Sequence, residues 1–298
     1  MTGQMQSPWT RLLQGPIVVG VDDSPNAAAA AGFARTLARR IGAECRLIHV
    51  AEPGRDPVAA GQRIRDALGQ IRPPLGLEDL EIDVGPTAEK LVERAVALNA
   101  ALLIVGGKHH SLLGRWMAGS TAVGVARLSP IPVLVTRGAV GVISHVLVGA
   151  DASPAAFGAI RTAEAWADLW LADLRVVHAV PMPAVLPEYG GGFEVDELRT
   201  SGEARAVEAI WPLIGRAKTE RVVEVGSAAQ VLSEQAKFWQ AELLVVARHD
   251  RGWVERAMVG SVTERLLDAL PTSLLVVPAT KIAAPKGATA EVPQEVAR

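Results

Sequence analysis

The sequence predicts an α/β protein of two tandem domains, each a parallel sheet with helices on both faces. One reason is its length of 298 residues, since domains typically have about 100–200 residues. A second is internal repetition, because "PIVVGVDDSPNAAAA" (16–30) is echoed by "HVLVGADASPAAFGA" (145–159). A third is the alternation of short apolar runs with helical segments, which is typical of parallel strands buried on both faces.

The repeat extends along most of the chain. Asp22 and His49 align with Asp151 and His178 at one offset, whereas Gly85 and Gly119 align with Gly226 and Gly260 at an offset that is 12 residues larger. The second copy therefore carries an insertion between its second and third strands, which includes residues 183–197 and whose Pro and Gly residues indicate a loop. The period is far longer than the roughly 20–50 residues of a solenoid unit, so the chain contains a duplicated domain.

The boundaries of the two repeats divide the chain into four predicted parts. We expect an N-terminal extension (1–14), a first domain (15–139), a second domain (140–278) and a disordered tail (279–298).

The elements of the first copy alternate in order along the chain. Ser24 is a good helix N-cap and Pro25 suits a first helical turn, so a helix follows the first strand directly. We expect five strands, at 17–21, 45–50, 80–85, 102–107 and 132–136, and further helices at 60–71, 87–100 and 120–128.

This order of elements predicts where a ligand binds. Ligands of such sheets bind at the carboxyl ends of strands, where the strand order reverses. Asp22 follows the first strand and Gly106 ends the fourth. If these two strands are neighbours, Asp22 and the loop after Gly106 face one crevice.

Composition excludes several classes of protein. A net charge of -2 and a pI near 6.3 give no electrostatic footprint for nucleic acid. No apolar run of about 18 residues predicts a membrane span, and the N-terminus has no signal-peptide core. The single cysteine, Cys45, rules out an intramolecular disulfide, so we expect a cytoplasmic protein.

The stretch "GGKHHSLLGRWMAGS" (106–120) has the composition of a phosphate-binding loop. Gly106 and the glycine after it allow a ligand to approach the backbone, and Gly119-Ser120 opens a helix whose free N–H groups favour an anion. Lys108 and Arg115 add positive charge, and no acidic residue is present. The Walker sequence is absent. The alternative is a tight turn followed by a helix start.

Five motifs occur twice in one order. They are "VGVDDS", "IHV", "VGPTAE", "VGGKHH…GS" and "SPIPVLVTR", repeated as "VGADAS", "VHAV", "VGSAAQ", "VARHD…GSVTERLL" and "PTSLLVVP". Both halves thus resemble the universal stress protein family. The resemblance implies two Rossmann-like (adenine nucleotide alpha hydrolase-like) domains that pair within the chain, with further homodimerisation, and a stress-response role.

Many members of this family bind ATP through G-x2-G-x9-G-[ST]. Here Gly106 takes the first position, His109 replaces the second glycine, and Gly119-Ser120 completes the spacing. If the second position needs a positive φ, His109 is mildly strained there. The resemblance implies ATP binding with Mg²⁺ in the first domain by Gly20, Val21, Asp22, Val50, Val105, Gly106, His109, Gly119, Ser120 and Thr121.

The second copy of the loop is degenerate. Asp151 and Gly260-Ser261 remain, but Ala247 and Asp250 replace the two early glycines. A carboxylate near a polyphosphate is repulsive by about a kcal/mol or more. We therefore expect no nucleotide in the second domain.

Two sets of side chains, two histidines and four tryptophans, have structural interpretations. His49 and His178 take matching places in the repeat, without neighbouring metal ligands, so packing or a backbone hydrogen bond is favoured over a metal site. Four tryptophans on predicted helices are expected to anchor the core or the domain interface rather than to stack on a ligand: Trp166, Trp170, Trp211 and Trp239.

The sequence therefore predicts a sensor or interaction module and not an enzyme, because no nucleophile–base pair is evident; any ATP hydrolysis would be incidental. Two alternatives stay open. One is a related nucleotide enzyme that catalyses adenylyl transfer or slow ATP hydrolysis. The other is a nucleotide-free scaffold that binds a protein or a lipid-like partner, which the lost glycines and the insertion favour.

Overall fold

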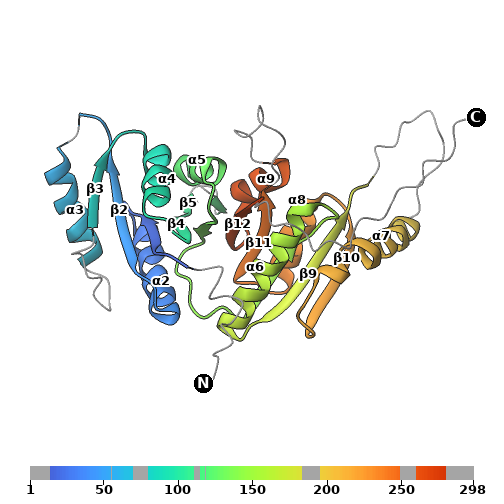
Figure 1. Ribbon diagram of the computed structural model, residues 1–298. Coiled ribbons are helices and arrows are strands. Elements are labelled where there is room, and N and C mark those ends of the chain that lie inside the picture. Colours follow the sequence, from blue (N-terminus) through green and yellow to red (C-terminus); the bar gives the residue numbers. More distant parts are fainter. Residues whose placement is uncertain are drawn as a thin grey trace, which may run out of the picture.

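The computed structural model describes residues 14–54, 56–69, 80–110, 115–117, 119–182, 195–248 and 260–279, and the structural statements below concern these residues. It confirms the predicted α/β class (Figure 1). The predicted disordered tail, apart from residue 279, and nearly all of the N-terminal extension lie outside the described residues. Most of the insertion lies outside them as well.

The elements of the first half follow the predicted order. They are β1 (Ile17–Gly20), α2 (Pro25–Ile41), β2 (Cys45–Ala51), α3 (Pro57–Gly69), β3 (Leu80–Val84), α4 (Thr87–Ala97), β4 (Leu102–Gly106), β5 (Lys108–His110), β6 (Arg115–Met117), α5 (Ser120–Leu128) and β7 (Val133–Thr136). Helix α5 has the predicted bounds, and the other ends shift by a few residues. The short hairpin of β5 and β6 was not expected.

The second half repeats this series. It contains β8 (His145–Gly149), α6 (Pro154–Trp170), β9 (Asp173–Val180), α7 (Val195–Ala209), the 3-10 helix η2 (Trp211–Leu213), β10 (Thr219–Val225), α8 (Ala228–Phe238), β11 (Leu243–Arg248), α9 (Ser261–Ala269) and β12 (Ser273–Pro278). Helix α7 begins inside the loop predicted at 183–197, and its acidic first turn, Asp196 and Glu197, suits a helix N-terminus.

The two halves share one ten-stranded sheet, in the order β10-β9-β8-β11-β12-β7-β4-β1-β2-β3. Within each half the five strands are parallel, as predicted. The halves meet where β7 pairs antiparallel with β12, so that Val133 lies opposite Val276. The predicted pairing of domains within the chain is therefore an edge-to-edge joining of two sheets.

Helices cover both faces of this sheet. On one face, residues of α2, α3, α6 and α7 pack on the strands, and on the other face residues of α4, α5, α8 and α9 do so. Each buried cluster contains residues from both halves. The core is thus continuous across the domain boundary. In the described part of the chain, no helix is long and apolar enough to cross a membrane.

Aromatic side chains pack across the boundary between the two halves, on the face of the sheet that α2 and α6 cover. The Phe33 ring of α2 stacks on Trp166 and Trp170 of α6, with centroids 6.4 and 5.9 Å apart. Arg40 lies 4.8 Å from the centre of the Trp170 ring, and its Nε donates to the Leu169 carbonyl over 2.9 Å. For Trp166 and Trp170, the prediction that they anchor the core or the domain interface is confirmed.

Candidate functional site

A cavity of about 350 Å³ opens at the carboxyl ends of β1, β2 and β4. This volume lies within the range of about 300–1,000 Å³ that is usual for small-molecule sites. Strand β1 pairs with β2 on one side and with β4 on the other, so the strand order reverses here. Asp22 and Gly106 both line the cavity, and the expectation that they face one crevice is confirmed.

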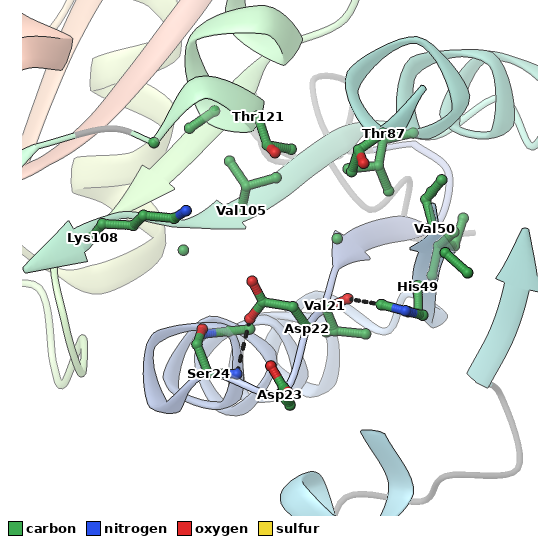
Figure 2. Close-up of a pocket in the computed structure, with 18 of the residues that line it drawn as sticks. Val21, Asp22, Asp23, Ser24, His49, Val50, Thr87, Val105, Lys108 and Thr121 are labelled. Carbon is green, nitrogen blue, oxygen red and sulfur yellow. Dashed lines mark hydrogen bonds between the residues drawn. The ribbon is translucent and has the colours of Figure 1, made fainter. Parts of the chain in front are cut away.

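The loop after β1 forms one wall. The Asp22 Oδ1 atom accepts a hydrogen bond from the backbone N–H of Ser24 over 3.0 Å, and the Ser24 Oγ accepts from Ala27 N–H over 3.2 Å. Ser24 is therefore the N-cap of α2, as predicted, and Pro25 is in the first turn. These bonds fix the loop with the Asp22 carboxylate beside the cavity, as Figure 2 shows.

Strand β2 supplies an adjoining wall through Val50 and His49. The His49 Nδ1 lies 2.8 Å from the Val21 carbonyl oxygen, so the ring ties β2 to the loop after β1 (Figure 2). The matching His178 Nδ1 lies 3.0 Å from the Ala150 carbonyl oxygen. The predicted backbone hydrogen bond is confirmed at both positions. Among the residues that the structure describes, no group of His, Cys, Asp or Glu forms a metal cluster.

Two glycines allow close packing around the cavity. A Cβ on Gly106 would lie 2.9 Å from the carbonyl carbon and oxygen of Asn26, in the first turn of α2. A Cβ on Gly20 would lie 2.7 Å from the Leu91 Cδ1 of α4. Glycine at these positions therefore lets β1 and β4 approach the helices that frame the cavity.

The start of α5 forms the polar end of the cavity. Gly119 is the N-cap and has no side chain with which to satisfy the first N–H groups of the helix. The Lys108 side chain crosses this helix start, because a Cβ on Gly119 would lie 2.8 Å from the Lys108 Cε. Figure 2 places the Lys108 nitrogen on the cavity side, with Thr121 nearby. Free N–H groups beside a lysine favour an anion.

His109 and Ser120 fall in different places from the other predicted residues. The His109 backbone is part of β5 and pairs with Trp116 of β6. A strand residue has a negative φ, so the left-handed strain considered for His109 does not arise. Ser120 is the exposed first residue of α5 and is not one of the residues lining the cavity, whereas Gly20, Val21, Val105, Gly119 and Thr121 are.

Sequence reasoning missed several residues of the cavity lining. They are Asp23, Glu52, Arg63 and Thr87. Glu52 directly follows β2, Asp23 lies in the loop after β1, and Thr87 begins α4, so their places at the carboxyl ends of strands were a usable signal. Arg63, on α3, gave no such signal.

The second half keeps part of this framework. The Asp151 Oδ1 accepts from Ser153 N–H over 3.1 Å, as Asp22 does from Ser24. Gly260 is the N-cap of α9, and Ser261 is its first residue. Ala247 lies in β11 in place of a glycine, and Asp250 lies outside the described residues. The degenerate second site stays a prediction.

Comparison with known proteins identifies the family. The model of the universal stress protein family matches residues 15–137 and again residues 143–278. The chain belongs to the universal stress protein family. It is a tandem member, because the family domain occurs twice.

Relatives of similar length share this arrangement. A universal stress protein of Mycolicibacterium smegmatis is 29% identical over 292 residues, covering 88% of this chain and 96% of the relative. A functionally unknown protein from Pseudomonas aeruginosa PAO1 superposes with a TM-score of 0.64 at 18% identity, covering 91% of this chain and 95% of that one. A universal stress protein from Archaeoglobus fulgidus DSM 4304 gives 0.62 at 16% identity, covering 93% and 100%. These structures support the fold.

Proposed function

We propose that the first domain of this universal stress protein binds an adenine nucleotide and acts as a nucleotide-dependent sensor or interaction module. The observation that carries the proposal is the cavity at the end of β1 and β4. It has apolar side chains at one end, a carboxylate in its wall and an uncapped helix start beside a lysine at the other end. This order of environments suits a base, a sugar and a phosphate group.

Each part of a nucleotide has a matching group. Val21 and Val50 offer apolar surface to a base, and the Asp22 carboxylate can accept hydrogen bonds from ribose hydroxyls. The N–H groups at the start of α5 and the Lys108 ammonium can bind phosphate oxygens. ATP with Mg²⁺ fits this set, because Mg²⁺ is usually held by one or two carboxylates together with substrate phosphates, and Asp22 and Asp23 both line the cavity.

The proposed role is binding without dedicated catalysis. Ser24 and His49 are among the cavity side chains that could act as nucleophile or base, and both already serve the backbone: the Ser24 Oγ caps α2 and the His49 Nδ1 bonds the Val21 carbonyl. We expect purified protein to turn over ATP no faster than a variant that does not bind it. Sustained hydrolysis that depends on the first-domain cavity would overturn this part of the proposal.

The experiment is calorimetric titration of the protein with ATP, with and without Mg²⁺, and with AMP. Wild-type protein should bind one nucleotide per chain. Gly119→Asp should abolish binding, because a carboxylate would stand where the phosphates meet α5. The fold should survive, because aspartate is a good N-cap residue.

The matched control is Gly260→Asp, the same substitution at the N-cap of α9. It should leave the affinity and the stoichiometry unchanged. Two nucleotides per chain, or retained affinity in Gly119→Asp, would reject the site. Failure of the wild-type protein to bind either nucleotide at millimolar concentration would favour the nucleotide-free scaffold instead.

A further inference from the structure

An arginine of the second domain reaches into the first. Arg248 is the last residue of β11, where the second copy of the glycine-rich loop begins. In the repeat it takes the place of Gly107, which has no side chain. The Arg248 side chain therefore makes contacts that have no counterpart at Gly107.

These contacts are made with the end of α5. The Arg248 Nη1 donates to the carbonyl oxygens of Ala126, Arg127 and Ser129, over 2.9, 2.9 and 2.8 Å. Ala126 and Ser129 are almost fully buried. Carbonyl groups in the last turn of a helix lack partners within the helix, and a cation at that end also interacts favourably with the helix dipole.

Helix α5 connects this contact with the proposed nucleotide site. Its nine residues span about 13 Å at 1.5 Å per residue. Its first turn lines the cavity, and its last turn is bonded to Arg248. Tight packing limits adjustment in between, because a Cβ on Gly124 would lie 2.8 Å from the Ala88 Cβ of α4. We therefore expect so short and closely packed a helix to shift as one body.

We propose that Arg248 is a positioning residue for the nucleotide site of the first domain. It holds α5 from the opposite end, so that the affinity of the cavity depends on contact with the second domain. Arg248, where the predicted degenerate loop of the second domain begins, would thus have a role in the site of the first domain. This inference rests on the proposed function of the first domain.

The test compares Arg248→Met with Arg40→Met. Arg40 also crosses the domain boundary, bonds the Leu169 carbonyl near the end of α6 and stacks on Trp170, on the other face of the sheet. Both variants remove one arginine that caps carbonyls across the boundary. Only Arg248 contacts α5.

Two measurements are made on the full-length proteins. Calorimetric titration with ATP and Mg²⁺ should show at least about a fivefold loss of affinity in Arg248→Met, the lower end of typical coupling between sites, and no change in Arg40→Met. Amide hydrogen exchange without nucleotide should be faster over residues 120–129 in Arg248→Met alone. Arg248→Lys, which keeps a cation at the helix end, should recover part of both effects.

The outcomes separate this inference from the proposed function. Equal affinities, or equal exchange over residues 120–129, in the Arg248 and Arg40 variants would overturn the positioning role. If the wild-type protein binds no nucleotide, the proposed function fails, and the exchange comparison still decides whether Arg248 holds α5.

Discussion

Gly106→Ala offers the sharpest test of how the cavity is built, because it adds one methyl group at a known place. The new Cβ would lie 2.9 Å from the Asn26 carbonyl carbon and oxygen and 3.1 Å from the Ala27 nitrogen. These atoms are backbone in the first turn of α2 and cannot rotate away. Either β4 or the start of α2 must move, and both form walls of the cavity.

The expected effect follows from this overlap. Adding a methyl group to a packed interior typically destabilises a protein by about 1–3 kcal/mol. Each kcal/mol lowers the melting temperature by about 2–4 °C for a protein of roughly 150–250 residues. Because either movement shifts a wall of the cavity, we also expect roughly a tenfold weaker nucleotide affinity, which corresponds to about 1.4 kcal/mol.

The assay is differential scanning calorimetry together with nucleotide titration, with Gly32→Ala as the matched control. Gly32 lies within α2, and a Cβ there would meet nothing within 4 Å. Alanine in a helix interior is favoured over glycine by roughly 0.5–1 kcal/mol, so the control should be as stable as wild type or more stable. If Gly106→Ala behaves like Gly32→Ala in both assays, the packing account of the cavity is wrong.

Two further predictions concern the structure around the site. Phe33→Ala should lower the free energy of unfolding by about 3–5 kcal/mol, because the ring is buried against Trp166 and Trp170. Denaturant unfolding followed by tryptophan fluorescence measures this free energy. A decrease of less than about 1 kcal/mol would contradict the prediction. Glu164→Ala should destabilise the second half by about 1–3 kcal/mol for each backbone N–H left without an acceptor, because its Oε1 accepts from Gly215 and Arg216 over 2.6 and 2.8 Å. Glu164→Gln should recover part of that stability, and nucleotide affinity should be unchanged in both variants.

The parts of this structure that the sequence predicts are those with local signals. Apolar runs without alternation identify strands buried on both faces, and Ser24 with Pro25 locates the start of α2. The place of Asp22 beside Gly106 follows from the general rule about strand ends. Each of these inferences needs only neighbouring residues and the order of elements.

The features that escaped prediction depend on partners distant in the chain. Strands β7 and β12 are apolar on both faces, like the central strands, so their sequences do not reveal that they pair with each other. Arg248 bonds carbonyl groups that carry no sequence signature, more than a hundred residues away. Gly106 was interpreted as room for a ligand, whereas the structure shows that the backbone of α2 also requires it.

The asymmetry of the domain boundary has a physical reason in the tandem arrangement. In a symmetric dimer the same surface patch serves both partners, so every interface substitution appears twice and must be compatible with itself. A single chain is free of that requirement. Here α2 contributes Phe33 and α6 contributes two tryptophans, and Arg248 stands where the first copy has Gly107. The tandem arrangement therefore allows one half to keep its cavity while Arg248, at the end of β11 in the other half, bonds the end of α5, and the Arg248 and Gly119 variants test whether roles are divided in this way.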